Sequence, residues 1–130
     1  MRDKPCSASI RTGRLRKAIQ FLDQAMVIKD LADDDDDVSD AFVSLCVLAG
    51  IAAADVVCCA RLGRYAQGED HGQAVALLEQ ASRPAAPHLS RLLDIKSKAA
   101  YTSTAASRTD VRLAERAAGQ LVDFARQSSG

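Results

Sequence analysis

The stretch that decides the fold is AFVSLCVLAGIAAADVVCCARLG, residues 41–63. Its apolar residues cover almost the whole circumference of a helix, which is typical of the central helix of a bundle. Ser39 or Asp37 is expected to cap the start of this helix, and Gly63 suits the left-handed position that ends one. The small residues between positions 49 and 54 would let neighbouring helices approach closely, or would form the seam of a dimer.

Apolar residues at three- and four-residue spacing predict four further helices around this one. The first ends at an acidic run, Asp33–Asp37, because adjacent carboxylates repel each other and Asp is a poor helix former. No window alternates like a strand. The expected helices lie at about Thr12–Leu31, at Asp70–Ser82 with Asp70 as the cap, at His88–Ser103, and from Ser107 to about residue 127 with Asp110 completing a capping box.

This pattern predicts an all-α fold, a bundle of four long helices with one short extra helix. The 130 residues form one helical domain, with a basic N-terminal tail over about residues 1–11 and the bundle over about residues 12–127. Aromatic residues are only 4% of the chain, so alanine and leucine must build most of the core. The second helix has more apolar surface than one neighbouring layer can cover, which favours a two-fold homodimer.

Composition excludes several classes of protein. Hydrophobic residues are 48%, charged residues 26% and the formal net charge +0, which argues against a disordered chain and a general DNA-coating protein. The longest uncharged run, Ala41–Ala54, is short for a bilayer, and no export signal is expected.

The four cysteines lack metal-ligand spacing and are expected to be free thiols in the cytoplasm. We expect no metal, no cofactor and no membrane contact.

Asp55 is the first candidate for a functional residue. It lies inside the most apolar helix, where an unpaired carboxylate would cost several kcal/mol. One interpretation is a buried structural bond to Tyr101 or to a lysine of the fourth helix. The other is a catalytic or ligand-binding carboxylate at a cleft.

The segment RYAQGEDH, residues 64–71, is the richest polar cluster. Gly63 and Gly68 favour a turn there, and the N-terminus of the following helix offers free N–H groups to an anion. Arg64 and His71 could together hold a phosphate. The alternative is a capped surface loop without a ligand.

Five segments of the chain belong together in this respect: Ala49–Cys58, Leu62-Gly63, Gly68-x-x-His71, Leu92-Leu93-x-x-Lys96-x-x-x-x-Tyr101 and Ser107–Ala125. Together they resemble a bacterial HEPN domain of the high-GC Gram-positive type. HEPN domains are bundles of four or five helices that often dimerise. Many are ribonucleases or toxins, and others pair with a small nucleotidyltransferase in toxin–antitoxin or defence modules.

The resemblance also implies where a catalytic motif would lie. Ribonuclease members carry an Arg and then a His near the late helix, commonly ahead of a Tyr. Here Tyr101 matches, but Ala99 stands at the position of the His, and Asp94 or Lys96 at that of the Arg. Alanine cannot act as a general base, so we expect no metal-independent ribonuclease activity.

These observations lead to a degenerate, non-catalytic HEPN protein that acts by binding. Its partner would be a nucleotide, RNA, a nucleotidyltransferase or a nuclease. One alternative is a metal-independent ribonuclease that uses Arg64 and His71, and another is a plain helical protein-interaction domain. The candidate ligand-binding residues are Asp55, Arg64, His71, Lys96 and Tyr101.

Overall fold

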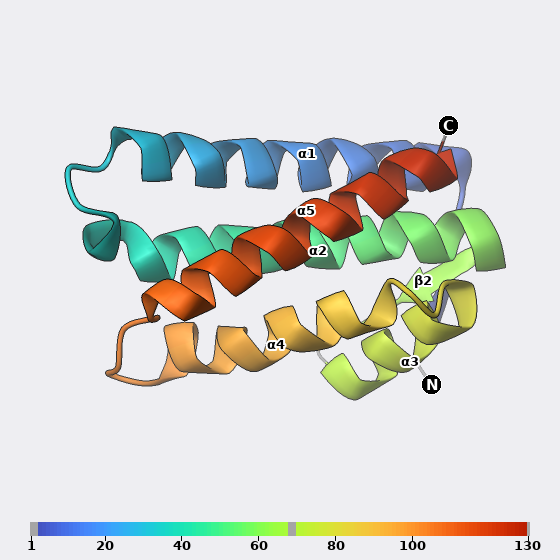
Figure 1. Cartoon of the computed structure of the whole chain (residues 1–130). Helices are drawn as coiled ribbons and strands as arrows, with labels where there is room; N and C mark the ends of the chain where they lie inside the picture. The colour runs from blue at the N-terminus through green and yellow to red at the C-terminus, as the bar shows by residue number, and fades with distance from the viewer. Residues whose placement is uncertain (1–2, 68–69, 130) are drawn as a thin grey trace.

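In the computed structural model, which describes residues 3–67 and 70–129, five α-helices and two very short strands form one bundle (Figure 1). Four of the helices are long and α3 is short, which confirms the mostly helical fold class expected from the sequence. The helices are α1 (Ala8–Leu31), α2 (Ser39–Leu62), α3 (His71–Ala81), α4 (Ala86–Tyr101) and α5 (Arg108–Ser129).

α2 is the central helix, as predicted. It packs against α1, α3, α4 and α5, and most of its residues are buried. In Figure 1 it lies between α1 and α4, with α5 crossing in front of it. The segment Asp35–Leu62 is long and apolar enough to cross a membrane, yet 72% of its most apolar window is buried within the fold, as in a core helix. Its own chain covers much of its apolar surface, although Leu48 is 44% exposed, and a dimer stays a prediction from the sequence.

Three helix ends lie where capping residues in the sequence predicted them. Gly63 adopts φ 71° and ends α2 by donating its N–H to the Cys59 carbonyl at 3.0 Å. Asp70 caps α3, since its Oδ1 accepts from the Gln73 N–H at 3.0 Å. Ser107 and Asp110 bond each other's N–H groups at the start of α5. All three ends confirm the sequence prediction, although Gly68, also assigned to the turn before α3, lies outside the described residues.

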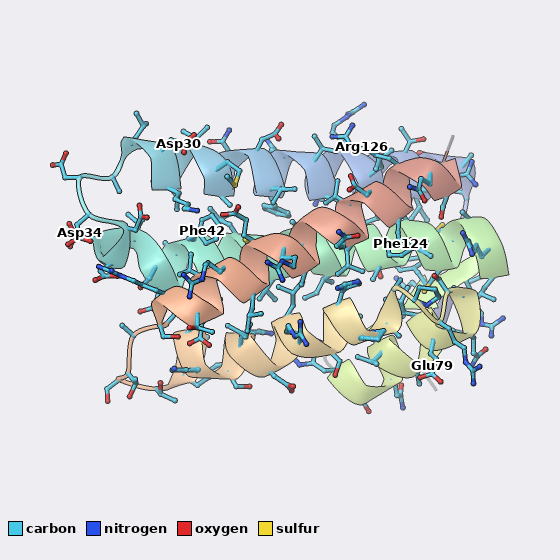
Figure 2. All side chains as sticks on the ribbon, viewed as in Figure 1. Asp30, Asp34, Phe42, Glu79, Phe124 and Arg126 are labelled. Carbon is cyan, nitrogen blue, oxygen red and sulfur yellow. A yellow bond between two sulfur atoms is a disulfide. The ribbon has the colours of Figure 1, made fainter. Side chains whose placement is uncertain are left out.

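The start of α2 differs from the prediction. Neither Ser39 nor Asp37 caps it, because the acidic run itself forms a short 3₁₀ helix, η1 (Asp35–Val38), that leads directly into α2. Asp34 caps η1 by accepting from the Asp36 N–H at 3.0 Å. Figure 2 shows the labelled Asp34 in this connection, at the opposite end of the bundle from Glu79 of α3.

The N-terminal segment also differs from the expected basic tail. Its first helix, α1, begins four residues earlier than predicted, because the Ser7 hydroxyl accepts from the Ile10 N–H and caps it. Before it, β1 (Asp3–Pro5) pairs antiparallel with β2 (Arg64–Ala66). The prediction that the chain contains no strand was therefore wrong. Three residues are too few to show alternation, and the pairing joins segments far apart in the sequence.

The prediction of four free thiols was wrong for two of them. Cys6 and Cys59 form a disulfide, with their Cα atoms 5.4 Å apart, while Cys46 and Cys58 are free and buried. The two cysteines are 53 residues apart in the sequence, so no local pattern could predict that they pair. It arises because the chain start folds back onto the C-terminal end of α2.

Candidate functional site

A cavity of about 380 Å³ is lined in part by residues of β2 and α3. Figure 1 shows these two elements at one end of the bundle. The walls of the cavity come from α1, α2, β2, α3 and α4, so no single element could form it. Apolar side chains line much of it, and a few polar groups converge on it, as in small-molecule sites. The apolar residues of the lining are Ile51, Ala54, Ala66, Ala74, Leu89 and Leu93, and the others are Arg14, Asp55, Cys58, Tyr65, Gln67, His71 and Lys96.

Helical spacing places the wall that α2 contributes. Ile51, Ala54, Asp55 and Cys58 follow the i, i+3, i+4, i+7 pattern, so they share one face of the helix. On α4 the same rule brings Leu89, Leu93 and Lys96 into line. Each of the two helices thus places one charged residue in the cavity wall, Asp55 from α2 and Lys96 from α4.

Asp55 is held by Arg14 of α1. The Nε and Nη2 atoms of Arg14 both lie 2.9 Å from Asp55 Oδ2. The sequence prediction of a bonded carboxylate is confirmed, but the predicted partners were wrong: Tyr101 ends α4 with 75% of its surface exposed. The sequence did not predict Arg14 as the partner, because nothing in it distinguishes Arg14 from its basic neighbours on α1.

Burial controls the charge of this carboxyl group. Loss of hydration raises the pKa of Asp55 from 3.8 to about 6, against the opposing effects of the Arg14 charge and its hydrogen bond. Only 13% of the Asp55 side chain is exposed, compared with 27% for Arg14. Asp55 is therefore a paired structural carboxylate that also forms part of the cavity wall, and its catalytic or ligand-binding role stays a prediction.

His71 and Lys96 meet on another wall of the cavity. His71 is the first residue of α3, directly after its cap, and Lys96 comes from α4. Lys96 Nζ lies 3.4 Å from His71 Nε2. Three of the five candidate residues, Asp55, His71 and Lys96, therefore line one cavity.

Arg64 and Tyr101 do not join them. Arg64 belongs to β2, where its Nε lies 2.8 Å from Asp3 Oδ2 and its Nη2 donates to Gln80. Neither Arg64 nor Tyr101 is among the cavity-lining residues. In the described part of the chain, Arg64 and His71 share no bond and no common cavity. Across residues 3–67 and 70–129, no cluster of three or more His, Cys, Asp or Glu side chains could hold a metal ion.

The raised pKa of Asp55 predicts a pH dependence of stability. Between about pH 4 and pH 6 the folded chain retains a proton that the unfolded chain has lost, so this group makes the fold less stable as the pH rises. From about pH 5 to pH 7.5, the parent should lose about 1–2 kcal/mol of unfolding free energy relative to Asp55→Asn. Urea titrations at several pH values measure this difference.

Asp123→Asn is the matched control, because Asp123 is exposed on α5. Its stability should follow the parent at every pH. Parallel curves for the parent and Asp55→Asn would contradict the raised pKa. The comparison also cancels the opposite trend expected from His88, whose pKa is lowered by burial and by nearby Arg91.

Comparisons of the chain with protein-family models, with curated proteins and with solved structures gave no match.

Proposed function

We propose that this protein is a non-catalytic, HEPN-like binding protein that holds a small anionic ligand of the nucleotide class in the cavity beside Asp55. The observation that carries the proposal is one cavity in which Lys96, His71 and the Arg14–Asp55 pair face apolar walls. Its volume of about 380 Å³ falls within the range of small-molecule sites.

The charges favour an anion. Asp55 is matched by Arg14, so Lys96 supplies the remaining positive charge of the cavity. Its ammonium group has three N–H donors, and the neighbouring His71 ring can use only one of them. Lys96 therefore has donors left for a phosphate or carboxylate oxygen. Charge-assisted bonds of this kind are about twice as strong as neutral ones.

The apolar walls favour a ligand that also has a flat or hydrophobic body. Leu89, Leu93 and Ile51 offer no hydrogen bonds, and Tyr65 adds an aromatic ring from β2. A nucleotide combines such a body, the base, with a phosphate. Because the cavity is small, we propose a single nucleotide as the ligand in preference to an RNA strand.

The arrangement supports binding over catalysis. Position 99, where the resemblance places the catalytic His, is a partly buried Ala of α4. The residues of the alternative catalytic pair have separate places: Arg64 forms an ion pair with Asp3, and His71 lines the cavity. A homodimer, a nucleotidyltransferase partner and a cytoplasmic location remain predictions from the sequence.

Titration calorimetry with AMP, adenosine and inorganic phosphate tests the proposal. AMP should bind most tightly, because it alone offers both a base and a phosphate. Lys96→Ala should weaken AMP binding by at least about tenfold, given the ~1.5–3 kcal/mol of a hydrogen bond to a charged group.

Arg91→Ala is the matched control, since it removes a positive charge from an exposed site on the same helix and outside the cavity. It should leave AMP affinity unchanged. Two results would overturn the proposal: no binding of AMP to the parent, or equal weakening by both variants. Adenosine binding as tightly as AMP would refute the role of the anionic group.

A further inference from the structure

The Cys6–Cys59 disulfide joins the start of α1 to the end of α2, two of the helices that line the cavity. Cys6 connects β1 to α1, and Cys59 lies in the last turn of α2. Beside the disulfide, the Cys6 N–H donates to the Gly63 carbonyl at 3.0 Å. The bond therefore ties the start of the chain to the end of the central helix.

The cavity walls are directly attached to these tied segments. On α2, Cys58 is adjacent to the disulfide and Asp55 lies one turn before it. On β2, Tyr65 and Ala66 line the cavity. These two residues pair with Lys4 and Asp3 of β1, so the strand that Cys6 anchors lies beside the strand that forms this wall of the cavity.

Little else holds β1 in place. The sheet has two strands of three residues, and isolated two-stranded ribbons are only marginally stable in water. All three residues of β1 are exposed. The ion pair between Asp3 and Arg64 is about a third exposed on both sides, and such surface pairs contribute little. The disulfide is therefore the covalent tie between this end of the chain and α2, and it acts together with the Cys6–Gly63 hydrogen bond.

We propose that reduction of the Cys6–Cys59 disulfide by a dithiol switches the cavity to a low-affinity state, by releasing β1 from the β2 wall. The inference rests on the proposed function of the cavity. The dithiol attacks Cys6 Sγ, because Cys6 is the less buried of the two residues, and forms a mixed disulfide while Cys59 leaves as a thiolate and takes up a proton. The second thiol of the reductant then displaces Cys6. The products are two cysteine thiols and one oxidised, cyclic disulfide of the reductant.

The other two cysteines do not compete in this reaction. Cys46 and Cys58 are buried, and loss of hydration raises the pKa of each thiol to about 12. Buried thiols without a thiolate population are poor nucleophiles. Cys58 immediately precedes Cys59 on the same helix, and a bridge between such neighbours would be strained.

AMP affinity, measured by calorimetry before and after treatment with dithiothreitol, tests the switch. If one reduced molecule in ten keeps the β2 wall in place, the apparent affinity falls about tenfold. Cys6→Ser should bind weakly in both conditions. Cys46→Ala is the matched control, because it removes a free thiol and should still respond to reduction. Hydrogen exchange of the β2 amides should accelerate in the reduced parent and in Cys6→Ser.

Circular dichroism establishes that the reduced protein is folded. If it is not, trimethylamine N-oxide is added to favour the compact state before binding is measured. Equal AMP affinity and equal β2 exchange in the two redox states would overturn the switch alone. No AMP binding in the oxidised parent would overturn the proposed function and the switch with it.

Discussion

Reducing the Cys6–Cys59 disulfide is expected to lower the free energy of unfolding by about 4 kcal/mol, the chain-entropy value for a loop of this size. The bond closes a loop across 53 residues, which contains all of α1 and most of α2. Without it, the unfolded chain gains the freedom that the loop had removed. Guanidinium titrations with and without dithiothreitol measure the difference.

Cys6→Ser provides the control for this experiment. The variant should have the stability of the reduced parent and should not respond to dithiothreitol. Four reactive thiols in the denatured, unreduced parent would contradict the disulfide. Disulfides persist mainly in oxidising compartments, so the expectation of a cytoplasmic location loses the support that four free thiols had given it.

Gly50→Ala is expected to lower the free energy of unfolding by about 1–3 kcal/mol, although alanine is the better helix former. A Cβ atom at position 50 would clash with Leu92 Cδ1 and would lie 3.2 Å from Leu121 Cδ1. Both leucines are 0% exposed, so neither can turn toward solvent. Because the core is close-packed, the added methyl group must displace α4 or α5 from α2. Thermal and urea unfolding measure the loss.

Gly119→Ala is the matched control on α5. Nothing lies within 4 Å of a Cβ atom added there, so the same substitution should stabilise the protein by about 0.5–1 kcal/mol. A second control is the double-mutant cycle with Leu92→Ala, which makes room for the new methyl group. In that background the cost of Gly50→Ala should largely disappear. A stabilising Gly50→Ala in the parent would show that α2, α4 and α5 can separate without cost.

Gly50 also illustrates how far the sequence was informative about packing. Small residues between positions 49 and 54 predicted a close helix approach, and Gly50 lies against Leu92 and Leu121 of two other helices. The same residues were equally consistent with a dimer seam. Only the positions of α4 and α5 decide that the close neighbours belong to the same chain.

The candidate site was predictable in part. The buried setting of Asp55 marked it as a residue that needs a partner, and His71 follows the Asp70 cap that local spacing had indicated. Arg14 could not be found in this way, because its role depends on where α1 crosses α2 and not on its sequence neighbours. Tyr101, predicted from the resemblance, and Arg64, predicted from the polar segment 64–71, both lie outside the cavity.

By itself, the sequence determined the five helices, the central position of α2 and the helix ends at Gly63, Asp70 and Ser107. These features depend on interactions within a few residues and on the amount of apolar surface that each helix must bury. Tertiary structure alone decided the Arg14–Asp55 pair, the Cys6–Cys59 disulfide, the β1–β2 pairing and the cavity. Each of these joins atoms from distant segments, whose approach depends on how the helices pack and leaves no local signal in the sequence.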